Sequence, residues 1–169
     1  AVASHHFWRG DVASALKVFA RLEASSMPND VRTAGIRSAA SAAWLGLITQ
    51  GEADASAAES RRSLANGPQA VMTDVHWSDA VLAISAQDSM RFATALRALA
   101  DTSVLHQRIS RGLRALWRER QTGQVDSLIA SEDDEMRTLG TFLPMVPLTR
   151  LAIRRALTLA NDPRPAGYY

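Results

Sequence analysis

The chain of 169 residues contains no cysteine. Disulfide bonds, thiolate metal sites and a cysteine nucleophile are therefore excluded, and the composition suits a cytoplasmic protein, which is the location we expect. Long hydrophobic runs are also lacking. The longest, such as Val81-Leu82-Ala83-Ile84, are far too short to cross a bilayer, so we expect no membrane partner.

The start of the chain lacks the basic residues and apolar core of a signal peptide. Because it begins at Ala1, inside an expected helix, we interpret it as a piece of a longer protein or a processed product. A length of 169 residues suits one domain with a sizeable core, which we place at 1–160. Residues 161–169 contain two prolines and a glycine and are expected to form a flexible tail.

Aromatic residues make up only 6% of the chain, and β-branched residues are sparse as well. No stretch alternates apolar and polar residues over the length of a strand. Alanine and leucine, which are good helix formers, are abundant. The composition and the hydrophobic pattern therefore predict an all-α fold.

Lysine occurs once, at Lys17, so arginine supplies nearly all of the positive charge. The formal net charge is only +2, and the sequence pI of 9.7 overstates the basicity. An arginine-rich coding habit explains this composition most simply. Guanidinium groups also bind carboxylates and phosphates in a bidentate manner, so the placement of the arginines decides whether they form a site.

Four stretches of the chain resemble one another, and each contains one of the four tryptophans. In each, a helix runs into a turn and a second amphipathic helix follows. The expected turn positions are Gly10, Gly51, Gln87 and Gly123, which are 41, 36 and 36 residues apart. Self-similarity at such a period is typical of stacked helix-turn-helix units.

The pattern predicts four helix pairs and a closing helix. In the second pair, Ile36, Ala40, Ala43, Trp44 and Leu47 are expected to face inward, and small residues on the following helix allow close packing or leave a shallow groove. Leu148, Leu151, Ala152, Ala156 and Leu159 are expected to line one side of the closing helix. The predicted helices are 1–9 and 11–25, 31–49 and 52–64, 70–86 and 88–100, 103–121 and 124–131, and 148–159; the acidic segment 132–135 is either a loop or the start of another helix.

The Gly10-Asp11 junction, with Ala15 and Phe19 after it, resembles the tetratricopeptide repeat. The resemblance covers roughly residues 1–131 and weakens along the chain, and the units are longer than the usual ~34 residues of that family. Long units rich in alanine and arginine are also similar to the degenerate arrays of large bacterial LuxR-type transcription regulators. The resemblance implies a right-handed solenoid of helical hairpins that binds a partner, as part of a bacterial regulatory protein.

No arrangement of residues indicates catalysis, a metal or a cofactor. His5 and His6 point about 100° apart on a helix, and no third ligand accompanies the histidines elsewhere. There is no Gly-x-Ser-x-Gly elbow and no glycine-rich phosphate loop. We therefore predict no catalytic residue, no metal ligand and no cofactor.

The strongest candidate for a binding surface is a strip of arginines on the predicted helix 103–121. At 100° per residue, Arg108, Arg111, Arg114 and Arg118 fall within an arc of about 120°. The leucines and isoleucine of this helix, with Trp117, occupy a separate arc, so one face packs and the other presents guanidinium groups. The strip is either ordinary solvated surface or a site for an acidic peptide, a carboxylate or a phosphate. Duplex nucleic acid is the weakest option, because the overall charge is nearly balanced.

The tryptophans also have two interpretations. At helical spacing beside leucines they are typical core residues, whereas in a solenoid Trp8, Trp44 and Trp77 could face a ligand on the concave surface. We therefore predict a non-catalytic binding module for a peptide or protein, with the arginine strip and these tryptophans as contacts. A small-molecule-sensing domain of a transcription regulator and an all-α enzyme with a cavity between helices are the alternatives.

Overall fold

The computed structural model describes residues 6, 9, 11–23, 32–100, 103–136 and 145–160. Within these ranges the regular structure is entirely helical, which confirms the expected all-α class. The chain divides into two compact units, Ala1–Ala98 and Leu99–Tyr169, and each is described by itself below. The predicted tail at 161–169 and the turn at Gly10 lie outside the described residues.

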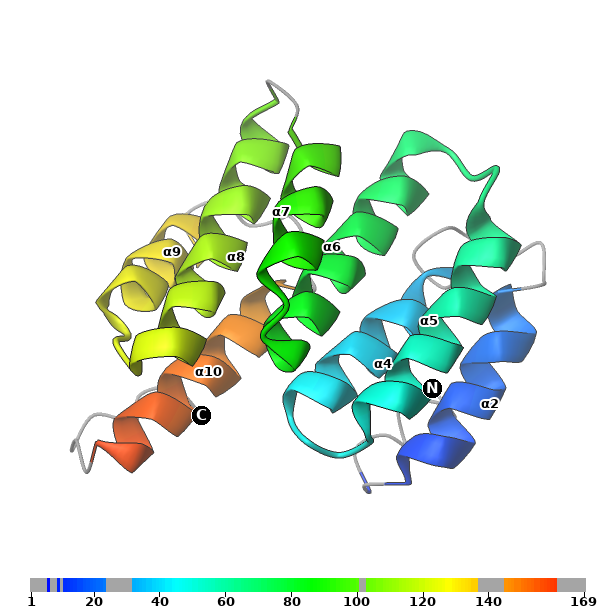
Figure 1. Cartoon of the computed structure of the whole chain (residues 1–169), viewed down its shortest axis with the longest axis horizontal. Coiled ribbons are helices and arrows are strands. Elements are labelled where there is room, and N and C mark those ends of the chain that lie inside the picture. The colour runs from blue at the N-terminus through cyan, green and yellow to red at the C-terminus, as the bar shows by residue number, and fades with distance from the viewer. Residues whose placement is uncertain are drawn as a thin grey trace. The chain divides into compact units, whose positions relative to one another are not determined.

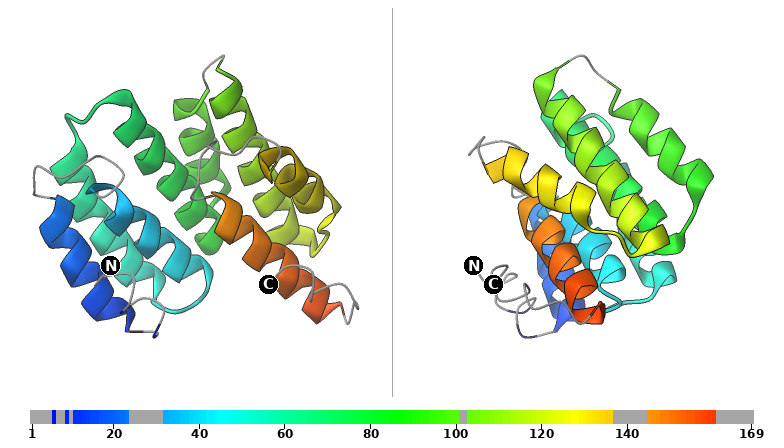
Figure 2. Two further views of the ribbon diagram at one scale, coloured as in Figure 1. Left: turned by 180° about the vertical axis from the view of Figure 1, so that it is seen from behind. Right: turned by 90° about the vertical axis from the view of Figure 1, so that its left-hand side faces the viewer.

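The first unit contains five of the labelled helices (Figure 1). Helix α2 packs against α4 and α5, while α6 packs against α4, α5 and α7. Figure 2 shows the same neighbours from two further directions. The helices are α2 (Val12–Glu23), α4 (Ala34–Trp44), α5 (Gln50–Leu64), α6 (Gln69–Ala86) and α7 (Ser89–Ala98).

Helix α6 is the most deeply buried element of the first unit. Trp77, Leu82 and Ile84 on α6 are fully buried, and they share the core with Ile36 and Trp44 of α4. Burial extends around nearly all sides of α6 between Val71 and Ile84, which is typical of a helix enclosed by others.

Helices α4 and α5 approach their neighbours through small residues. Ala39, Ala40 and Ala43 of α4 are buried, and α5 buries Ala53 and Ala57. Of the residues predicted to face inward on α4, four are buried, but Leu47 lies beyond the end of the helix and is 50% exposed. The helix ends at Trp44, earlier than predicted, because the chain turns at Gly46.

A buried carboxylate joins α4 to α6. Asp74 accepts hydrogen bonds from the hydroxyl of Thr33, at the start of α4, and from Nη1 of Arg37 at 3.3 Å. Near the other end of α6, Ser85 donates a hydrogen bond to the carbonyl of Ala43 at 3.1 Å. These bonds satisfy polar groups at the interface and fix the register of the two helices.

The second unit contains α8 (Val104–Thr122), α9 (Asp126–Met136) and α10 (Met145–Leu159), each of which contacts the other two. The core of this unit includes Ile109, Leu113 and Leu116 of α8. Helix α9 continues through residues 132–135, so the acidic segment is helical and not a loop.

The closing helix differs from its prediction in length and in register. It begins at Met145 and not at Leu148, with a proline tolerated in its first turn. Ile153 and Leu157 are buried, whereas Leu151 is half-buried and Leu159 is 76% exposed. The buried stripe is therefore rotated relative to the predicted one, although Leu148, Ala152 and Ala156 belong to both.

Three first helices of the predicted pairs end at a residue with positive φ. These residues are Gly46 after α4 (72°), Gln87 after α6 (55°) and Gly123 after α8 (70°). The left-handed conformation reverses the chain and suits glycine. Two of them are predicted turn positions, but Gly51 lies inside the first turn of α5, so the turn of the second pair is at Gly46 instead.

We predict opposite effects for two glycine-to-alanine substitutions. Neither Gly123 nor Gly51 has an atom within 4 Å of an added Cβ, so sterics are matched. Gly123→Ala places a Cβ on a left-handed residue and should lower the free energy of unfolding by about 1 kcal/mol. Gly51→Ala, in a helix, should raise it by up to about 1 kcal/mol.

Urea denaturation followed by circular dichroism measures both changes, and amide hydrogen exchange assigns each to its unit. Destabilisation by Gly51→Ala, or no loss with Gly123→Ala, would contradict the assigned backbone conformations.

Candidate functional site

A groove of about 400 Å³ lies between α8 and α9 in the second unit. Three of the predicted arginines line it, together with small residues from both helices. We call it the arginine groove and define it by Arg111, Arg114, Ala115 and Arg118 of α8 and Ser127, Ala130 and Ser131 of α9.

The groove follows from the helical repeat of α8 and the turn that follows it. Arg111, Arg114 and Arg118 are three and four residues apart, so they lie in one row along the exposed face. Gly123 ends α8 in the left-handed conformation, and α9 then packs back along α8. Ala130 and Ser131 follow Ser127 by three and four residues, so the three share one face of α9, and their short side chains leave the arginines accessible.

At two of the three arginines, Arg114 and Arg118, no carboxylate of the described residues pairs with the positive charge. Arg118 Nη2 donates a 3.5 Å hydrogen bond to Oε1 of Gln124, which is uncharged. In the described parts of the chain, Arg114 has no ion pair with a carboxylate, and none of the residues that line the groove is acidic. The arginines of the groove can therefore donate bidentate hydrogen bonds to a carboxylate or a phosphate.

A buried carboxyl group lies next to the arginine row on α8. Glu119 is only 6% exposed, and its Oε2 atom has no hydrogen-bond partner among the described residues. Burial raises the pKa of Glu119 above its ordinary value, although the positive charges of Arg155 and Arg120 act in the opposite direction. Sequence reasoning missed this group, because an acidic residue in an arginine-rich helix is expected to be exposed.

The fourth predicted arginine differs from the other three. Arg108 is half-buried and does not line the groove, so the exposed strip is shorter than predicted and begins at Arg111. Arg108 stands between the buried residues His106 and Ile109 in the sequence, at the edge of the packed face of α8. The serines of α9 were not predicted, because no local pattern indicates which helix packs beside α8.

The tryptophans are not brought to the groove. Trp44 is 2% exposed and Trp77 is fully buried, so both belong to the core of the first unit and present no ring surface to a ligand. This burial agrees with the first of their two interpretations and corrects their assignment as contacts. Trp8 lies outside the described residues.

No group of three or more histidine, cysteine, aspartate or glutamate side chains that could hold a metal ion occurs among the described residues. None of the helices described is both long enough and apolar enough to cross a membrane.

Comparison of the chain with protein-family models, with curated proteins and with solved structures finds no match.

We predict that Glu119→Gln stabilises the protein at neutral and alkaline pH. Because folding raises the pKa of Glu119, its carboxyl group loses the proton at a lower pH in the unfolded chain than in the folded protein. The contribution of Glu119 to stability is therefore full below about its ordinary pKa of 4.5 and is lost as the pH rises through the pKa of the folded protein. Glutamine resembles the uncharged acid, so the variant does not lose this stability as the pH rises.

Urea midpoints from pH 4 to pH 8 test this prediction, with the exposed Glu59→Gln as the control. The advantage of Glu119→Gln should shrink as the pH falls, while Glu59→Gln should have little effect, because exposed ion pairs contribute little. A variant at position 119 that is less stable than the parent at pH 8 would show that the carboxylate has a partner in the folded protein.

Proposed function

We propose that the chain is a non-catalytic binding module that holds an acidic segment of a peptide or protein partner in the arginine groove. The observation that carries this proposal is the row of three exposed arginines beside small residues in one open groove. Each guanidinium has a planar set of donors that matches a carboxylate. An extended acidic segment can contact successive arginines along α8.

The expected strength of binding follows from the exposure of these arginines. Contacts between exposed charges contribute up to about 1 kcal/mol each, so three give a weak to moderate complex that salt weakens further. Apolar contacts of the partner with Ala115 and Ala130 add to this. Such an interface directs the approach and orientation of an acidic partner more than it fixes a tight complex.

The order of helices supports the wider architecture that we propose, a right-handed solenoid of helical hairpins similar to the tetratricopeptide repeat. The pairs α4–α5, α6–α7 and α8–α9 each pack together, and the first helix of each ends at a left-handed residue. Arrays of this kind present extended surfaces for partners. A place in a bacterial regulatory protein belongs to the same proposal and rests on the resemblance of the sequence.

The alternatives fit the groove less well. A small anionic effector could contact the same arginines, but it would leave part of the row along α8 without a partner. For an enzyme, the described residues of the groove provide no histidine or carboxylate to serve as a general base for Ser127 or Ser131.

Charge reversal tests the proposal directly. We expect Arg114→Glu with Arg118→Glu to weaken binding of a fluorescein-labelled peptide of alternating Glu and Ala by about 30-fold or more, because two attractive contacts of about 1 kcal/mol are lost and become repulsive. Fluorescence anisotropy at low and at physiological salt measures the affinity. The matched control is Lys17→Glu with Arg21→Glu, which makes the same change of charge at the same spacing on the exposed surface of α2.

Equal losses in the two double variants would show that the peptide responds only to net charge, and the groove would then be ordinary surface.

Native mass spectrometry of the protein purified gently from its host identifies the physiological partner. A co-purifying polypeptide supports the proposed module, whereas a bound small mass that is displaced by Arg114→Glu with Arg118→Glu favours the effector-sensing alternative.

A further inference from the structure

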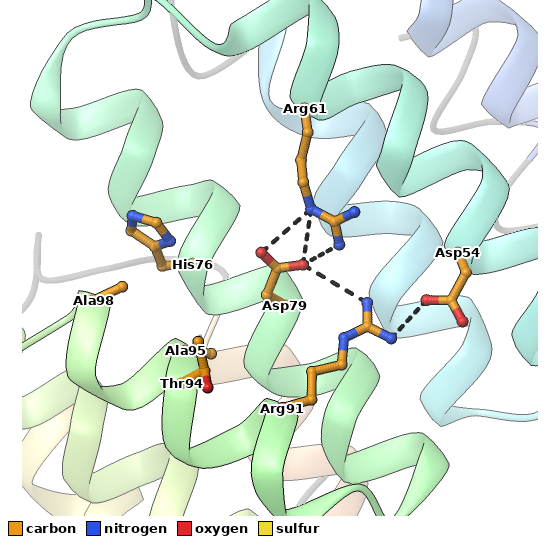
Figure 3. A pocket seen from close by; sticks show the side chains of 8 residues that line it. All are labelled: Asp54, Arg61, His76, Asp79, Arg91, Thr94, Ala95 and Ala98. Atoms are coloured by element: carbon orange, nitrogen blue, oxygen red, sulfur yellow. Dashed lines mark hydrogen bonds and ion pairs between the residues drawn. The ribbon is translucent and has the colours of Figure 1, made fainter.

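A second groove, of about 610 Å³, lies within the first unit, among α5, α6 and α7 (Figure 3). Its lining contains acidic, basic and imidazole side chains above two alanines. We call it the mixed-charge groove and define it by Asp54 and Arg61 of α5, His76 and Asp79 of α6, and Arg91, Thr94, Ala95 and Ala98 of α7.

Four charged residues of this groove form one continuous chain of ion pairs. Arg61 binds Asp79 in a bidentate manner, with its Nε 3.0 Å and 3.3 Å from the two carboxylate oxygens. Arg91 donates from Nη1 to Oδ1 of Asp54 at 2.7 Å, and its Nη2 lies 3.7 Å from Oδ1 of Asp79. Two positive and two negative charges therefore alternate across three helices and cancel in sum.

The pairing holds these charges in fixed positions before any ligand binds. The side chains of Asp79 and Arg91 are 20% and 26% exposed, so they are half-buried but still reach the groove. Groups that are already ordered lose little conformational entropy when they contact a ligand. The network thus presents positively and negatively charged side chains that are already ordered before a ligand binds.

Hydrogen-bonding capacity remains at both sides of the network. In the described part of the chain, neither the imidazole of His76 nor the second terminal nitrogen of Arg61 takes part in a hydrogen bond. Asp54 accepts one bond at each oxygen, from Arg91 and from Gln50, and each oxygen can accept another. Figure 3 shows His76 and Asp54 on opposite sides of the pair formed by Arg61 and Asp79.

The placement of these charged and hydrogen-bonding groups determines which class of ligand the groove can bind. A simple anion or cation gains little, since the four charges cancel, and the described side chains form no cluster of three metal ligands here. A molecule with a carboxylate and an ammonium group can contact both signs at once. Because Asp54 and His76 lie on opposite sides of the pair formed by Arg61 and Asp79, the two charges of the ligand must also be separated, as they are in a short peptide with free ends.

We propose that the mixed-charge groove binds a short zwitterionic peptide. The ammonium end contacts Asp54, the carboxylate end contacts the imidazole of His76, and the body of the peptide lies over Ala95 and Ala98. The volume is within the range of about 300–1,000 Å³ that is typical of small-ligand sites. This site does not depend on the arginine groove, which lies in the other unit.

Trialanine is the probe, and amide chemical shifts of the ¹⁵N-labelled full chain are the measurement. We expect saturable shifts in α5, α6 and α7. The N-acetylated and the C-amidated forms of trialanine should each bind at least about tenfold more weakly, because each lacks one of the two charges, a loss of about 1.4 kcal/mol.

Two matched variants locate the site. Ala98→Leu fills the groove without touching an ion pair and should weaken trialanine binding at least about tenfold, which is about 1.4 kcal/mol. Ala93→Leu adds the same side chain at an exposed position of α7 outside the lining and should leave binding unchanged. Circular dichroism confirms that both variants fold.

Several results would overturn the proposal: no saturable shift at millimolar trialanine, equal binding of the blocked peptides, or equal effects of the two alanine variants. Shifts confined to α8 and α9 would assign the peptide to the arginine groove instead. Arg114→Glu with Arg118→Glu should weaken binding of the acidic peptide by about 30-fold or more but leave that of trialanine intact, so the two proposals fail separately.

Discussion

The left-handed residues at Gly46, Gln87 and Gly123 are the constraint on which the helix pairs depend. Each ends one helix and turns the chain so that the next helix packs back along it. For Gly123 this packing brings the serines of α9 beside the arginines of α8. For Gln87 it brings α7 back along α6, where Arg91 reaches Asp79. The backbone conformation at single residues thus determines which side chains can form a groove.

The fold follows from the sequence at the level of helices, but less securely at their ends. Periodicity predicts the buried residues of α4 well, because helical spacing alone determines which residues share a face. Gly51 shows the limit: a glycine after an apolar helix indicates a turn, yet Gly46 five residues earlier takes that role and Gly51 joins α5. In the closing helix, burial of Ile153 and exposure of Leu159 depend on contacts with α8 and α9, which local pattern does not specify.

The two grooves differ in how far they could be predicted, and the reason is the distance along the chain between their residues. Three of the four arginines of the strip lie on one helix, so their common row follows from a rotation of 100° per residue. The mixed-charge groove joins Asp54, Asp79 and Arg91 from three helices. The spacing of His76 and Asp79, three residues apart, is the one local signal that this face of α6 carries polar groups.

The contrast between the grooves also shows what ion pairing does to a basic chain with a net charge of only +2. In the first unit, Arg61 and Arg91 are bound to carboxylates of the same unit, and their charge orders helices and is largely cancelled. Arg114 and Arg118 have no such described partner, so their field extends into solvent. The same residue type therefore stabilises packing in one groove and remains available to an anion in the other. Composition alone cannot separate these roles, because they depend on whether a neighbouring helix supplies a carboxylate.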